Sequence, residues 1–203
     1  FPEMYRAIFS IETILFNEVG DMDGEDALER RDVTQVVINR SQIPFFSSLE
    51  QRDSLMPYLS KKIRKKVFQN PWLNLLFKTG EFSFTYYYIS ATVNIFCPDE
   101  SPRGKRLRKK NIELALELLK KPNHAFKPTR YFSRASMLGR IDMSPMWDDY
   151  KPLNERPGNP VKNRSKLRRA MRAGKYKFLY GFEDPGGQKF EVVEIKRKNY
   201  VIN

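Results

Sequence analysis

The chain is poor in cysteine and histidine, and this scarcity limits the chemistry it can perform. Cys97 is the single cysteine and His124 the single histidine among 203 residues. One cysteine cannot form an internal disulfide or a cysteine metal cluster, and one histidine excludes every site that needs two. His124 stands between two prolines, which is more typical of a loop than of a catalytic site. We therefore expect no metal site, and we expect carboxylates to perform any acid–base catalysis.

Long apolar runs and phosphate-binding loops are also missing. No stretch reaches the roughly eighteen consecutive apolar residues that a membrane span needs, so we expect no such span. The sequence has no glycine-rich loop for phosphates, which argues against a nucleotide, and we expect no cofactor. The chain begins at Phe1 rather than methionine, so we expect that an upstream segment, such as a signal peptide, has been removed.

The chain is rich in apolar sequence and in positive charge. Hydrophobic residues make up 40% and aromatic residues 13%, enough for one sizeable core, and we predict a single domain over residues 1–203. Lysine and arginine number 37 against 24 acidic residues, which gives a net charge of +13. Basic runs at 61–66, 103–110 and 162–172 are typical of solvated faces or of surfaces that attract an anionic polymer.

Apolar side chains recur mostly at helical spacing, which predicts a mainly helical fold. Residues 4–18 and 27–40 carry them on most sides, as buried helices do. Further helices are predicted in a basic segment within 54–77, from Pro71 onward, and at 106–121 and 162–173. The aromatic segment 80–89 is predicted to be extended, residues 131–160 to be rich in loops, and 175–182 and 189–195 to be paired strands.

Glu18 is the main candidate for acid–base chemistry. It ends the first predicted helix, next to apolar residues, where a carboxylic acid can keep its proton near neutral pH. The plainer interpretation is a helix-terminal glutamate that reaches water or pairs with Arg40. Glu12 lies on a different side of the same helix and is the second candidate for the acid.

Several short motifs occur in a characteristic order. Residues 15–19 read Leu-Phe-Asn-Glu-Val, residues 36–40 read Val-Val-Ile-Asn-Arg, and residues 80–83 read Gly-Glu-Phe-Ser. An aromatic pair at 131–132, then Trp147, and then the segment 173–178 follow. In this order they resemble motifs of the cell-wall hydrolase family typified by the spore-cortex-lytic enzyme SleB, within the lysozyme and lytic transglycosylase superfamily.

The resemblance implies a fold and an activity. The fold is α+β, a mainly helical lysozyme-like domain in which a small β element lines a cleft. Its core spans about residues 4–180, with a basic insertion at about 152–173 and a C-terminal hairpin at 175–203. The activity is cleavage of the β-1,4 bond between N-acetylmuramic acid and N-acetylglucosamine in peptidoglycan. We expect a monomer that is secreted or located in the periplasm or cell envelope, with peptidoglycan glycan strands as its partner.

By the resemblance, Glu18 is the catalytic residue. As an acid it protonates the leaving oxygen, and as a carboxylate it then accepts a proton from the nucleophile. In a lytic transglycosylase the nucleophile is the sugar's own C6 hydroxyl, whereas a muramidase uses water and could need Glu81 as a second carboxylate. The substrate-binding candidates are Glu81, Ser83, Thr85, Tyr87, Tyr131 and Trp147.

The same residues have plainer structural interpretations. The hydroxyls of Ser83 and Thr85 can form hydrogen bonds with backbone groups as readily as with a sugar. Rings at Tyr131 and Trp147 stack on sugars but also fill cores. Asn39 and Arg40 are expected to cap the second helix and fix the acidic loop before it.

Two alternatives from other functional classes stay open. The first is a nucleic-acid-binding protein without catalytic activity, which would use the basic runs 103–110 and 162–172. The second is a peptidoglycan-binding protein with an inactive site, which would bind the wall without cutting it.

Overall fold

The computed structural model describes residues 2–19, 26–47, 62, 69–78, 82–85, 95–133, 178–183 and 190–193. The contacts divide the chain into two compact units, residues 1–126 and 127–203, and each is described by itself. The described part is mainly helical, as the sequence predicts, with one small sheet. The single domain expected from composition stays a prediction.

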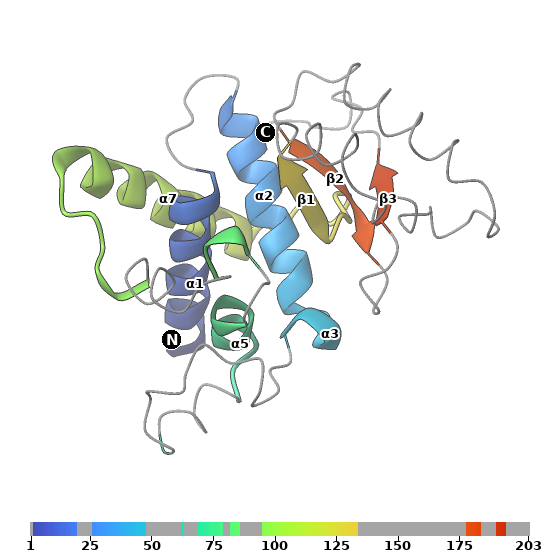
Figure 1. Ribbon diagram of the computed structural model, residues 1–203, viewed down its shortest axis with the longest axis horizontal. Coiled ribbons are helices and arrows are strands. Elements are labelled where there is room, and N and C mark those ends of the chain that lie inside the picture. The colour runs from blue at the N-terminus through green and yellow to red at the C-terminus, as the bar shows by residue number, and fades with distance from the viewer. Residues whose placement is uncertain are drawn as a thin grey trace. The chain divides into compact units, whose positions relative to one another are not determined.

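Helices build the first unit (Figure 1). Helix α1 packs against α2, α5 and α7, while α3 packs on α2 and α5. The described elements of this unit are α1 (Pro2–Glu18), α2 (Asp26–Ser41), α3 (Pro44–Ser47), α5 (Pro71–Phe77), the 3₁₀ turn η2 (Ser83–Thr85) and α7 (Pro102–Lys120).

Helices α1 and α2 form the centre of this unit, and both predictions are confirmed. In α1 the side chains of Ile11, Ile14 and Leu15 are completely buried, and polar neighbours between them are buried as well. In α2 Val33 and Val37 are completely buried, despite the lower helix propensity of β-branched residues. Tertiary burial of apolar side chains therefore outweighs local preference in α2.

Caps define where α5 and α7 begin. The side chain of Asn70 accepts a hydrogen bond from the backbone N–H of Leu73 at 3.0 Å, ahead of Pro71. Ser101 caps α7 in the same way, since its Oγ accepts from the N–H of Gly104 at 3.0 Å. Because of this cap, α7 starts earlier than the predicted residue 106.

The second unit contains an antiparallel sheet with the strand order β1-β2-β3. Its strands are β1 (Arg130–Ser133), β2 (Phe178–Glu183) and β3 (Phe190–Val193). The pairing of β2 with β3 confirms the predicted hairpin. The prediction that residues from 131 onward form loops is wrong for β1, where Tyr131 lies opposite Tyr180. Four residues are too few for a clear alternation, and the partner strand is distant in sequence.

The extended conformation predicted for 80–89 is also wrong where the structure describes it. Residues 83–85 form the 3₁₀ turn η2, which Thr85 closes: its hydroxyl donates to the carbonyl oxygen of Phe82 at 2.8 Å and accepts from the N–H of Phe82 at 3.2 Å. The predicted basic helix before Pro71 lies outside the described residues except for residues 62, 69 and 70, and the predicted helix 162–173 lies outside them altogether. No helix in the described ranges is both long and apolar enough to cross a membrane.

Candidate active site

Glu18 lies at the C-terminal end of α1, where its side chain is half-buried. Its Oε1 accepts a hydrogen bond from the backbone N–H of Phe84 at 3.4 Å, across 66 residues of sequence. This distance is long for such a bond, so the contact orients the carboxyl group rather than holding it tightly. The first motif of the sequence therefore lies beside the residue that follows the third motif.

The turn that contacts Glu18 is held by its own interactions. Thr85 is completely buried and bonds Phe82 through both its hydroxyl and its backbone N–H, the latter at 3.0 Å. The rings of Phe82 and Phe84 are nearly parallel, with centroids 6.1 Å apart. Because these contacts are local, the N–H of Phe84 is in position before any ligand arrives.

Arg40, in the last turn of α2, anchors this turn from the other side. Its side chain is among the largest that are fully buried, and the residue is 2% exposed. The guanidinium carbon lies 4.7 Å from the ring centroid of Phe82 and 5.1 Å from that of Phe46 in α3. A planar, weakly hydrated guanidinium suits a position between two aromatic rings. The second motif thus joins the other two through Phe82.

Asn39, the neighbour of Arg40, has a partner that the sequence did not indicate. Its side-chain amide donates to the carbonyl oxygen of Phe126 at 2.9 Å and accepts from Gln35 at 3.0 Å. Gln35 in turn accepts from the N–H of Asn123 at 2.8 Å. These bonds fasten the segment after α7 to α2. The acidic loop that Asn39 and Arg40 were expected to fix lies outside the described residues.

Glu12 is enclosed between α1 and α7 and is 3% exposed. Burial raises the pKa of its carboxyl group, while the Arg108 guanidinium and the hydroxyl of Thr13, each 3.5 Å from Oε2, act in the opposite direction. Oε1 has no hydrogen-bond partner. A carboxyl group so placed cannot reach a polymer outside the protein, so Glu18 is the better candidate for the acid.

The other predicted site residues are distributed unevenly. Thr85 lies one residue from Phe84, but its buried hydroxyl bonds backbone, which agrees with its structural interpretation. Ser83 belongs to η2, and its side chain is not described. Tyr131 is in β1 of the second unit and is 8% exposed. Glu81, Tyr87 and Trp147 lie outside the described residues.

The geometry adds two groups that sequence reasoning missed as site components, the N–H of Phe84 and the aromatic pair around Arg40. A backbone donor has no sequence signal. The aromatic pair had a weak one, because residues 45–46 and 82 are phenylalanines close to the second and third motifs.

Metal-binding chemistry has no visible basis in the described ranges. No group of three or more histidine, cysteine, aspartate or glutamate residues in them could hold an ion. Cys97 and His124 are both exposed there.

Comparisons of the chain with protein-family models, with curated proteins and with solved structures found no match. The functional argument therefore depends on the motifs and on the geometry around Glu18.

Proposed function

We propose that this protein cleaves the glycan strands of peptidoglycan at the β-1,4 bond between N-acetylmuramic acid and N-acetylglucosamine, with Glu18 as general acid and then base. The observation that carries the proposal is the convergence of three motif regions: Glu18 accepts from the N–H of Phe84, the residue that follows the third motif, and Arg40 packs on Phe82 within that motif. The motifs were recognised from their order in sequence, so their meeting in space is independent support. A lysozyme-like fold with a β element lining the cleft is part of the proposal.

The position of Glu18 suits a catalytic carboxyl group. The side chain is half-buried, so a ligand can reach it, and the N–H of Phe84 gives the carboxyl group a preferred orientation. The protonated carboxyl group donates its proton to the leaving glycosidic oxygen while positive charge develops on the sugar ring. The carboxylate that remains accepts a proton from the attacking nucleophile.

The nucleophile decides the class of enzyme. Attack by the sugar's own C6 hydroxyl releases a 1,6-anhydro product and needs no second carboxylate. Attack by water releases a reducing end, and Glu81 is then the candidate for the second acidic group. A secreted or envelope-bound monomer acting on the wall fits either route.

Digestion of purified peptidoglycan sacculi, native and chemically deacetylated, tests the proposal. Wild type, Glu18→Gln and Glu3→Gln are compared, and the released fragments are analysed by mass. Glu3 is a matched control because it is an exposed glutamate in the first turn of the same helix. We expect anhydro or reducing fragments from wild type and Glu3→Gln and almost none from Glu18→Gln. If the sacculi bind the protein but stay intact with all three, the protein is a wall-binding protein without catalytic activity.

A further inference from the structure

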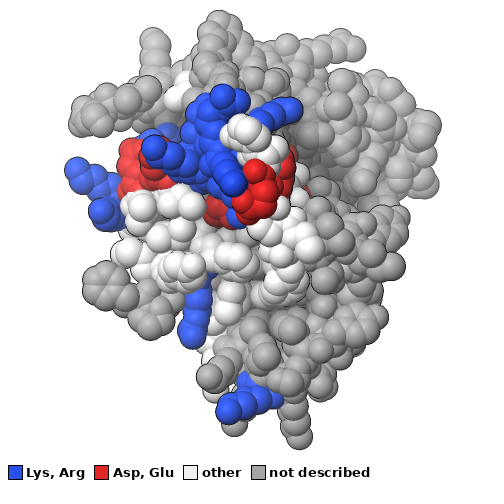
Figure 2. All heavy atoms as spheres, turned by 90° about the vertical axis from the view of Figure 1, so that its left-hand side faces the viewer, with Lys and Arg blue, Asp and Glu red and all other residues white. Residues whose placement is uncertain are grey.

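The first half of α7 concentrates basic side chains at one end of a helix. We call the residues Arg103, Lys105, Arg106, Lys109 and Lys110 the basic end of α7. All are exposed except Lys110, which is half-buried. Figure 2 views the side on which α7 begins and shows lysine and arginine gathered in one large group, with acidic side chains at its margin.

Neighbouring carboxylates neutralise this charge only weakly. Lys105 lies 3.2 Å from Glu100, and Lys109 lies 4.0 Å from Glu113, with all four side chains more than half exposed. Exposed pairs of this kind are screened by water and salt. The basic end of α7 therefore keeps a positive potential.

The charges stand at the end of the helix where they cost stability. A helix N-terminus carries a partial positive charge, so acidic residues favour it and basic residues do not. The first turn of α7 holds no acidic residue, and Glu113 and Glu117 come only in its second half. One carboxylate stands at this end: Asp99 accepts from the N–H of Ser101 at 2.9 Å, and this bond, together with Arg103 and Arg108, lowers its pKa.

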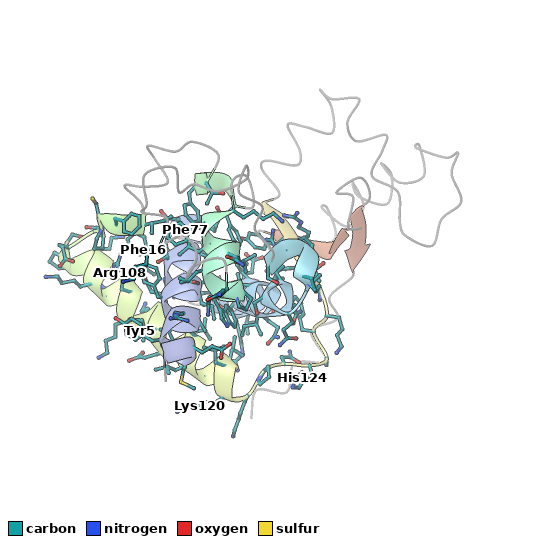
Figure 3. All side chains as sticks on the ribbon, turned by 90° about the horizontal axis from the view of Figure 1, so that it is seen from below. Tyr5, Phe16, Phe77, Arg108, Lys120 and His124 are labelled. Atoms are coloured by element: carbon teal, nitrogen blue, oxygen red, sulfur yellow. The ribbon has the colours of Figure 1, made fainter. Side chains whose placement is uncertain are left out.

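This surface contacts the last turns of α1. Arg108, within the basic run, places its guanidinium carbon 5.2 Å from the ring centroid of Phe16, two residues before Glu18. Figure 3 shows Arg108 beside Phe16, with Lys120 at the opposite end of α7. The basic end of α7 therefore lies near the last turn of α1, on the side of that helix that carries Phe16.

We propose that the basic end of α7 binds the carboxylate groups of the stem peptides on peptidoglycan and so holds the glycan strand on the protein. This inference rests on the proposed function. Stem peptides repeat along the strand and give the polymer regularly spaced negative charges, which several lysine and arginine side chains bind together. Helix α7 contains no aromatic residue on which nucleic-acid bases could stack, so the structure favours peptide carboxylates over a single-stranded nucleic acid.

The test measures binding of the full chain to insoluble sacculi, separately from cleavage. All variants carry Glu18→Gln so that the sacculi stay intact. Arg106→Gln/Lys109→Gln removes two charges from the basic end of α7. Lys120→Gln/Lys121→Gln is the matched control, because it removes two exposed charges from the other end of the same helix. Each protein is tested on native sacculi and on sacculi whose carboxylates have been converted to neutral amides.

The expected result is a loss of affinity confined to one variant and one substrate. On native sacculi at low salt, Arg106→Gln/Lys109→Gln binds roughly tenfold more weakly than its parent, and the control binds as the parent does. The difference disappears on amidated sacculi and in about 1 M salt, where the Debye length is about 3 Å.

Three results would overturn the inference. Equal binding by the two double variants would show that the basic end of α7 does not bind the sacculi. A difference that persists on amidated sacculi would show that carboxylates are not the groups it binds. Tighter binding to double-stranded DNA than to native sacculi, with the same loss in Arg106→Gln/Lys109→Gln, assigns the surface to nucleic acid. Failure of the wild type to cut sacculi, with this binding pattern intact, contradicts the proposed cleavage alone.

Discussion

Arg40 is the residue through which the fold supports the candidate site, and its replacement tests that support. In Arg40→Met an apolar chain replaces the guanidinium that lies between Phe46 and Phe82. A desolvated cation–π contact contributes about 2 kcal/mol, so losing two lowers the free energy of unfolding by at most about 4 kcal/mol, less the desolvation cost of the buried guanidinium that methionine does not have. Arg40→Lys keeps the charge but not the planar guanidinium, and we expect the free energy of unfolding to fall by about 1–2 kcal/mol.

Urea unfolding followed by circular dichroism measures these losses. Arg31→Met is the matched control, since Arg31 in α2 pairs with the exposed Glu117 at 2.7 Å and is itself only half-buried. We expect that control to lose less than about 1 kcal/mol. A domain of ordinary stability, about 5–15 kcal/mol, stays folded in every variant, so activity can be compared.

Activity on sacculi should fall with Arg40→Lys although the protein stays folded. The reason is that Phe82 then loses its anchor, and the N–H of Phe84 no longer holds Glu18 in the same orientation. We expect roughly a tenfold lower rate, because small misplacements of catalytic groups are costly. The reasoning is refuted if Arg40→Met and Arg40→Lys unfold at the same urea concentration as wild type.

Three further substitutions test the packing and caps of the first unit by urea unfolding. Burial raises the pKa of Glu12 in the folded state, so its contribution to stability is complete below the ordinary value of 4.5 and is lost as pH rises through the higher folded pKa. Glu12→Gln should therefore gain stability relative to wild type as pH rises above 4.5, and a difference that stays constant with pH would contradict this. Gly104→Ala should destabilise by about 1–3 kcal/mol despite alanine's helix propensity, because its Cβ would lie 2.4 Å from the carbonyl oxygen of Asp99; an increase in stability would show that this loop yields easily. Asn70→Ala should lower the free energy of unfolding by about 1 kcal/mol, because it removes the hydrogen bond to the N–H of Leu73. Asn70→Asp should keep most of that stability, because aspartate can accept the same bond.

The sequence predicts the helices well because their signals are local. The apolar periodicity of α1 and α2 survives as complete burial of Ile14 and Val37. The proline at 71 and the helical spacing before Pro122 locate α5 and α7 for the same reason. These helices can be predicted without knowing which distant residues they contact.

The sequence fails where distant contacts decide the structure. Strand β1 depends on pairing with β2, which follows much later in the chain. Turn η2 depends on one hydroxyl, that of Thr85, in a segment whose composition favours strands. The setting of Arg40 depends on three elements meeting, and no spacing within α2 indicates that its guanidinium lies between two rings. The order of the motifs in the sequence predicted Glu18 as the catalytic residue, whereas the contact between Glu18 and Phe84 could be seen only in the structure.

The most direct test of the central claim compares Glu18→Gln with Glu12→Gln in one sacculus digestion. The two substitutions remove the same chemical group from the same helix, one from a half-buried position next to η2 and one from the closed contact with α7. General acid catalysis contributes about 10²–10⁴-fold, so Glu18→Gln should release fragments at least about a hundredfold more slowly, while folded Glu12→Gln keeps close to the wild-type rate. Wild-type digestion by Glu18→Gln would contradict the assignment of Glu18 as the acid.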